Sequence, residues 1–227
     1  MASEIADRFP RYADFDPHVS VWSATPGTGR ATHRFFDTSP FSPSGRYLGL
    51  TRFLFEDRMP EPGDAAEVLL VDLKTGEERA VAETRGWGTQ LGAQVQWGSD
   101  DTELFFNDLD TELWRPFGVM MDPFSGERMA LGGTVYMVSP NGRQVASPCL
   151  LRAGSTQVGY GVTAPPEAVP VNRGASAEDG IYVTNTDTGA CQLLVSLKEM
   201  VETAVPAFDP DEYADGDFFG FHVKYNL

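Results

Sequence analysis

The chain has 227 residues, and its 33 Asp and Glu outnumber its 17 Lys and Arg, so the formal net charge is -16 at pH 7. With 41% hydrophobic and 22% charged residues, the composition is that of a soluble globular protein. A field of this sign repels a phosphate backbone and no basic cluster offsets it, which excludes nucleic acid as the leading partner. No apolar run approaches the roughly 18 residues of a membrane span, so no membrane partner is expected.

The N-terminus has no basic segment followed by an apolar one, so the chain as written predicts a cytoplasmic protein without a signal peptide. If a signal was removed and replaced by Met1, the sequence would look the same and the protein would be periplasmic or secreted. Cys149 and Cys191 have no metal-ligand spacing, and we interpret them as two buried thiols.

Short runs rich in Val, Leu, Tyr and Phe lie between the 23 glycines and 16 prolines, which predicts many short strands joined by turns. In chain order, strands are expected at residues 47–55, 67–73, 93–97, 103–108, 117–122, 134–139, 143–151, 181–186 and 191–197. Only residues 196–204 predict a helix, because their apolar residues fall on one face. The chain is therefore expected to be mainly β.

Two turn motifs alternate along the chain. The first is an apolar residue followed by a tight turn and a strand, and it begins at Phe41, Trp97 and Val138, which are 56 and 41 positions apart. The second is a hairpin whose glycine suits a positive φ, and these glycines are Gly76, Gly126 and Gly189. The alternation predicts three units of four short strands at about the period of propeller blades.

The repeat thus predicts an all-β fold, a β-propeller of four-stranded antiparallel blades, with about three to four blades in this chain. We expect an N-terminal extension over residues 1–30 and a partial propeller over residues 31–227. The blades are expected at about residues 38–86, 93–133 and 134–200, the last with an insertion over residues 153–179, and the start of the next blade at residues 216–227. A single strand there leaves an open sheet edge, so we expect either a longer reading frame or self-association through that edge.

Four stretches of the sequence together suggest a family. Residues 32–48 join His33 and Arg34 to the first turn, and residues 87–97 contain Trp-Gly-Thr-Gln ahead of the second. Gly159-Tyr160-Gly161 and the later Phe221-His222 complete the set. The first stretch resembles the opening of oligogalacturonate lyases, and the others resemble ulvan-lyase-like propellers. The likeness covers residue 30 onward but only the N-terminal half of such a protein.

The resemblance implies a seven-bladed TolB-like propeller that cleaves anionic, uronate-containing polysaccharide or oligosaccharide by β-elimination. That reaction needs a group that neutralises the carboxylate, a base for the C5 proton and an acid for the leaving oxygen. The catalytic candidates are Tyr160, His222, His33 and Arg173, with Arg173 as the neutralising cation. The candidates for substrate binding are Arg34, Gln90, Gln94 and Asn107. Each residue also has a structural interpretation, as a turn, core or strand-end residue.

The sequence departs from the family in one respect, because it has no histidine between His33 and His222. The family also implies a divalent metal, but its histidine ligands lie in later blades, so no metal ligand is assigned here. Three hypotheses therefore stay open: a polysaccharide lyase, a non-catalytic carbohydrate- or protein-binding propeller, and an inactive fragment of a lyase that associates through open sheet edges.

Overall fold

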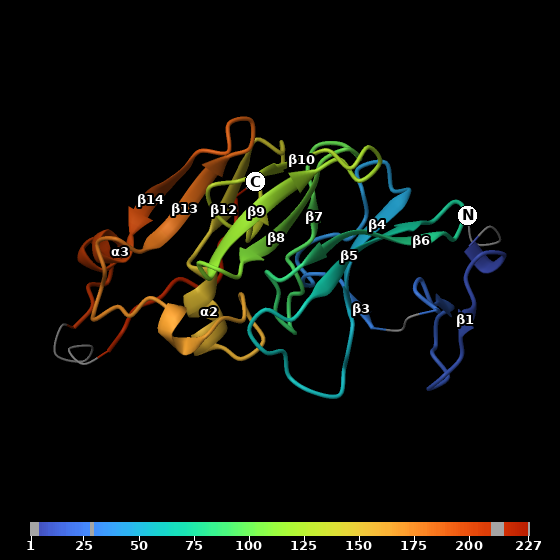
Figure 1. The fold of residues 1–227 in the computed structure, drawn as a ribbon, viewed down its shortest axis with the longest axis horizontal. Coiled ribbons are helices and arrows are strands. Elements are labelled where there is room, and N and C mark those ends of the chain that lie inside the picture. Colours follow the sequence, from blue (N-terminus) through green and yellow to red (C-terminus); the bar gives the residue numbers. More distant parts are fainter. Residues whose placement is uncertain (1–4, 28–29, 210–215, 227) are drawn as a thin grey trace.

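The computed structural model describes residues 5–27, 30–209 and 216–226. Its strands form three antiparallel sheets of four strands each and one two-stranded ribbon. The ribbon pairs β1 (Arg11–Tyr12) with β2 (Val21–Trp22). In Figure 1 the three larger sheets follow one another across the molecule in chain order.

Within each large sheet, consecutive strands are neighbours, which is the meander of a propeller blade. The first sheet contains β3 (Ala31–Thr32), β4 (Tyr47–Phe53), β5 (Ala66–Asp72) and β6 (Glu78–Thr84). The second sheet contains β7 (Gln96–Trp97), β8 (Leu104–Asp110), β9 (Arg115–Met121) and β10 (Arg128–Ala130). The third sheet contains β11 (Met137–Val138), β12 (Gln144–Ser147), β13 (Gly180–Asn185) and β14 (Cys191–Ser196). The expected all-β fold of four-stranded propeller blades is confirmed.

The hairpins form because one side chain and one glycine supply what each turn needs. Oδ1 of Asp72 accepts the backbone N–H of Lys74 at 2.8 Å, and Gly76 adopts a φ of +79°. Asp122 and Asn185 make the equivalent bonds in the second and third sheets. Because Asp and Asn favour such turns and glycine tolerates positive φ, these connections are encoded locally.

The nine strands predicted between residues 47 and 197 all overlap observed ones, but the two strands of the ribbon and three edge strands of the large sheets were not predicted. These strands, β3, β6 and β10, are short or partly exposed, so they lack the apolar alternation that a sequence pattern detects. The expected helix is confirmed as α3 (Leu197–Thr203), with Ser196 Oγ accepting the N–H of Glu199 at its start.

Two expectations about strands are wrong. The strand predicted over residues 143–151 ends at Ser147, and Pro148 leads into a short helix, α2 (Leu150–Thr156). The insertion after it contains the 3-10 turn η1 (Pro166–Ala168). Residues 216–226, where the next blade was expected to start, form no strand, and their one ladder contact is a bridge from Asp217 to Gly174.

Apolar side chains pack between neighbouring sheets. Trp87, Leu104 and Phe106 are nearly inaccessible to solvent in the largest cluster, between the first and second sheets. Burying each such side chain stabilises the fold by about 1.5–3 kcal/mol. The N-terminal segment joins a smaller cluster through Phe9, which packs with Leu48 of β4.

Buried polar side chains also tie one blade to the next. Gln96 on β7 donates to the carbonyl of Tyr136 and accepts the N–H of Val138, both at 3.1 Å. Thr51 on β4 accepts the N–H of Ala93 at 2.9 Å. The Gln96 bonds hold the first strands of the second and third blades together, and the Thr51 bond joins the first blade to the segment ahead of β7.

Candidate functional site

Two predicted residues, Arg34 and Gln94, meet Tyr136 at the ends of the first strands of the blades. Arg34 follows β3, Gln94 precedes β7, and Tyr136 precedes β11. Residues 221–225 of the C-terminal segment lie against them, as ring contacts from His222 to Phe35 and Tyr136 show. We call Arg34, Tyr136, Tyr160, His222 and Lys224 the central cluster.

Arg34 is the buried cation of the central cluster, with 1% of its side chain exposed. Its Nε donates to Gln94 Oε1 at 2.5 Å, and its Nη1 approaches Asp37 Oδ1 at 3.4 Å. The guanidinium carbon lies 4.5 Å from the centre of the Tyr136 ring, a cation–π contact. Burial lowers the pKa of Arg34 to about 10, and Tyr136 partly offsets this, so the side chain stays charged at neutral pH.

His222 and Tyr160 both contact one aromatic ring, that of Phe221. The imidazole of His222 is stacked on Phe221 with ring centres 4.3 Å apart, and Tyr160 meets the same ring at 4.9 Å. Burial raises the pKa of Tyr136, which the charge of Arg34 opposes and Tyr160 adds to. The structure therefore brings together the tyrosine and one of the two histidines that the sequence nominated.

A second cation, Lys224, lies beside Arg34. Its ammonium forms an ion pair with Asp37, the same carboxylate that Arg34 approaches, and 41% of the lysine side chain is exposed. Burial and the charge of Arg34 lower the pKa of Lys224. Two cations thus share one carboxylate in a chain whose net charge is -16.

One donor and one hydroxyl at the cluster have no hydrogen-bond partner among the described residues. These are Gln94 Nε2 and the hydroxyl of Tyr225, and both atoms are buried. Gln94 also adopts a φ of +61°, a strained conformation for a residue with a side chain. Strain of this kind costs free energy and is often found at functional sites.

His33 and Arg173 are not brought into the cluster by any contact within the described chain. Both are exposed, and among the described residues neither side chain has a hydrogen bond, ion pair or ring contact. Gln90 is exposed as well, but its backbone N–H donates to the carbonyl of Gly159 at 2.8 Å, so it anchors the loop that carries Tyr160.

Asn107 lies in the interior. It is 0% exposed, its Nδ2 donates to the carbonyl of Val135 and its Oδ1 accepts the N–H of Val135, both at 2.7 Å. Its amide therefore joins the second blade to the third and has no path to a ligand. For Asn107 the structural interpretation applies rather than substrate binding.

Sequence reasoning missed Tyr136 and Lys224, and it quoted Phe221 only as the neighbour of His222. Tyr136 stands two positions before the third copy of the first turn motif, where the chain enters a blade, and this repeat position was the available signal. For Lys224 there was no such signal, because the segment was expected to be an ordinary strand.

The described residues do not fit the divalent metal that the family resemblance implies. Within residues 5–27, 30–209 and 216–226, no three His, Cys, Asp or Glu side chains gather closely enough to hold an ion. We therefore derive no step through a metal. None of the helices in the described part of the chain is long and apolar enough to cross a membrane.

Comparison with known proteins yields structural similarity only. No known protein family and no curated protein sequence matches the chain. Its structure is similar to TolB from Acinetobacter baumannii, with 12% identity and a TM-score of 0.46, over 84% of this chain and 39% of that one. It is also similar to oligogalacturonate lyase from Vibrio parahaemolyticus, with 14% identity and a TM-score of 0.26, over 83% of this chain and 84% of that one.

The three four-stranded blades define the chain as a protein of the β-propeller type. It spans about two fifths of the length of the TolB chain it matches. Identities and TM-scores this low do not assign the chain to a lyase family, and they are no evidence about its activity.

Proposed function

We propose that this chain belongs to a propeller that binds anionic, uronate-containing polysaccharide or oligosaccharide at the central cluster and cleaves it by β-elimination. The supporting observation is that the rings of Tyr160 and His222 both contact the ring of Phe221, with ring centres 4.9 and 4.3 Å from it. Arg34 and Lys224 beside them give a local cationic site in an acidic chain, which suits a carboxylate ligand.

In this proposal the cations hold the uronate carboxylate and reduce its negative charge, which makes the neighbouring C5 proton more acidic. In this proposal the exposed Lys224 contacts the uronate carboxylate directly. The buried Arg34, which approaches the same Asp37 as Lys224, adds positive charge next to it. Lys224 replaces Arg173 as our candidate for this role, because Arg173 has no contact with the cluster among the described residues.

Tyr160 and His222 then divide the proton transfers. One of them removes the C5 proton, the C4–O bond breaks as a C4=C5 double bond forms, and the other donates a proton to the leaving oxygen. No water is consumed, and the new chain end is an unsaturated uronate. The choice of which side chain acts as base is settled by the pH dependence of the two single variants.

A second candidate function is non-catalytic binding of carbohydrate or protein, and one observation favours it. Asp37 already forms an ion pair with Lys224, and its Oδ1 lies 3.4 Å from Nη1 of Arg34. Nε of the same arginine already donates a hydrogen bond to Gln94. A ligand carboxylate therefore competes with an internal one. That arrangement suits weak, reversible binding as well as catalysis.

The test uses the whole chain with polygalacturonate and with ulvan, and it measures binding calorimetrically and turnover by the ultraviolet absorbance of the unsaturated product. We expect Tyr160→Phe and His222→Asn each to lower kcat by about 100-fold or more, the usual size of a general acid or base contribution, with little change in affinity. His18→Asn is the matched control, because His18 is an exposed histidine in the N-terminal segment.

Three results separate the alternatives. Turnover that depends on Tyr160 and His222 supports the lyase. Binding without turnover, weakened by Lys224→Ala, supports the non-catalytic propeller. Absence of binding to either polymer, or turnover that both variants retain, overturns the proposal.

A further inference from the structure

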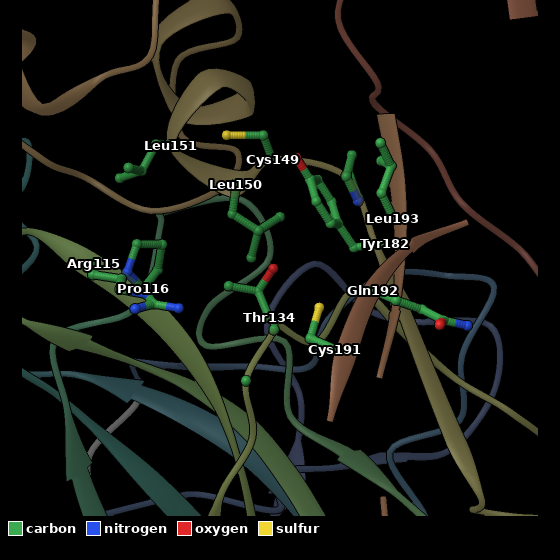
Figure 2. Close-up of a pocket in the computed structure, with 13 residues that line it drawn as sticks. Arg115, Pro116, Thr134, Cys149, Leu150, Leu151, Tyr182, Cys191, Gln192 and Leu193 are labelled. Carbon is green, nitrogen blue, oxygen red and sulfur yellow. The ribbon is translucent and has the colours of Figure 1, made fainter. Parts of the chain in front are cut away.

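A separate cavity of about 410 Å³ lies between the second and third sheets, away from the residues of the central cluster. Figure 2 shows Arg115 and Pro116 of β9 on one side and Tyr182 and Leu193 of the third sheet on the other. The start of α2, with Leu150, lies between them. The volume falls in the range of small-molecule sites in proteins.

Most of the cavity wall is apolar and uncharged. Pro116, Leu150 and Leu193 contribute aliphatic surface, and Tyr182 contributes its ring. The Tyr182 hydroxyl donates to the carbonyl of Glu178 at 2.8 Å, and burial raises its pKa to about 12. The phenol is thus neutral at physiological pH with its donor already used, so its ring is what a ligand meets.

Both cysteines of the chain line this cavity. Burial raises the pKa of the Cys149 thiol, which keeps it protonated at neutral pH. Cys191 packs closely on Gly133, because a Cβ added to Gly133 would lie 2.6 Å from its Sγ and 2.5 Å from Thr184 Oγ1. Gly133 therefore lets the sulfur sit at the floor of the cavity.

Arg115 is the one charged side chain among the residues that line the cavity. It is exposed, and within the described residues it has no ion pair or hydrogen bond from its side chain. Its neighbour across the strands is Asp110, whose Oδ1 already accepts the N–H groups of Glu112 and Leu113 at 2.9 and 3.0 Å. Arg115 is thus left with its guanidinium available at the rim.

From this arrangement we propose that the cavity binds a small amphipathic anion, an apolar body that carries one carboxylate or sulfonate. The apolar body lies between Leu150 and the Tyr182 ring, over the sulfur of Cys191. The anionic group faces Arg115. This site is independent of polysaccharide cleavage, so its test neither uses nor requires that activity.

The first experiment is a fluorescence titration of the whole chain with two probes that share their aromatic rings. Anilinonaphthalene sulfonate carries the anionic group, and phenylnaphthylamine lacks it. We expect Arg115→Gln to weaken the sulfonate by about fivefold, the size of one partly exposed ion pair, and to leave phenylnaphthylamine unchanged. Arg128→Gln is the matched control, because Arg128 is an exposed arginine on β10 of the same sheet and does not line this cavity.

The second experiment tests whether the sulfonate probe binds inside the cavity, by measuring how far it protects thiols from alkylation. The chain has two cysteines, Cys149 and Cys191, and both line the cavity. Sulfonate at ten times its Kd should slow alkylation of Cys191 by about tenfold, since only the unoccupied fraction reacts. Leu193→Trp narrows the mouth and should weaken both probes. Leu194→Trp is its control, since Leu194 is 61% exposed on the same strand and is not part of the lining.

The proposal is overturned if the sulfonate does not bind or leaves both thiols unprotected. It is also overturned if Arg115→Gln binds the sulfonate as tightly as the unmodified chain does. Circular dichroism of each variant checks that its fold is retained. Loss of the Arg115 effect with thiol protection intact would mean an apolar cavity without anion recognition, which also contradicts the proposal.

Discussion

The tie between the second and third blades gives the most direct test of the fold. Asn107 makes two hydrogen bonds of 2.7 Å to the backbone of Val135, and both residues are 0% exposed. Asn107→Ala removes both bonds and leaves a backbone N–H and a carbonyl without partners in the interior. The change therefore acts on stability and on no ligand contact.

The expected loss follows from these contacts. A typical hydrogen bond contributes about 1 kcal/mol, and each buried group left unpaired costs about 1–3 kcal/mol, so we expect Asn107→Ala to lower the free energy of unfolding by about 3 kcal/mol. In a chain of this length that corresponds to a decrease in Tm of about 6–12 °C. Asn141→Ala, in an exposed turn, should cost about 0.5 kcal/mol and serves as the control.

Asn107→Asp sharpens the test because it keeps the shape of the side chain. A carboxylate there faces the Val135 carbonyl, so burial raises its pKa in the folded chain above the value of about 4 in the unfolded chain. As the pH rises, the introduced carboxyl group therefore ionises at a lower pH in the unfolded chain than in the folded chain. We therefore expect this variant to be least destabilised below about pH 4 and to lose stability as the pH increases.

Urea denaturation followed by circular dichroism measures all three variants, with an unchanged m-value as the check that the transition is the same. A loss below about 1 kcal/mol for Asn107→Ala, within the range of ordinary surface substitutions, would refute the reasoning. An Asn107→Asp variant whose stability does not depend on pH would do so as well.

Two further predictions concern ionisable groups. A hydrogen bond from Arg46 lowers the pKa of Asp72, so Arg46→Gln should raise that pKa in an NMR titration. Because a lowered carboxyl pKa stabilises above the unfolded value, the stability difference between the two proteins should disappear as the pH falls through the folded pKa. Burial raises the pKa of Tyr182 to about 12, so Tyr182→Phe should remove a late step from the alkaline absorbance titration of the seven tyrosines. Because the pKa of Tyr182 is higher in the folded chain than in the unfolded chain, the folded state loses stability as the pH rises from about 10 towards 12. The prediction fails if the variant titrates like the parent chain.

The structure brings some of the predicted site residues together and leaves others apart. Tyr160, His222, Arg34 and Gln94 lie at or beside the central cluster, but what joins them was not visible beforehand. Phe221 connects Tyr160 to His222 from a segment that was expected to be a strand. The remaining candidates differ in exposure: His33, Gln90 and Arg173 are exposed, whereas Asn107 is buried. The exposure of a residue depends on which blades surround it.

The sequence by itself determined the hairpins and the blade repeat. A turn such as the one at Asp72 and Gly76 depends on a backbone angle and on a hydrogen bond between residues two to four positions apart, so local chemistry is enough to specify it. Only the tertiary structure decided that the Asn107 amide is hydrogen-bonded between the second and third blades rather than free for a ligand. It also decided that Lys224 lies beside Arg34. Those outcomes depend on contacts between segments tens to nearly two hundred positions apart, which exist only once neighbouring blades pack and their buried polar groups find partners.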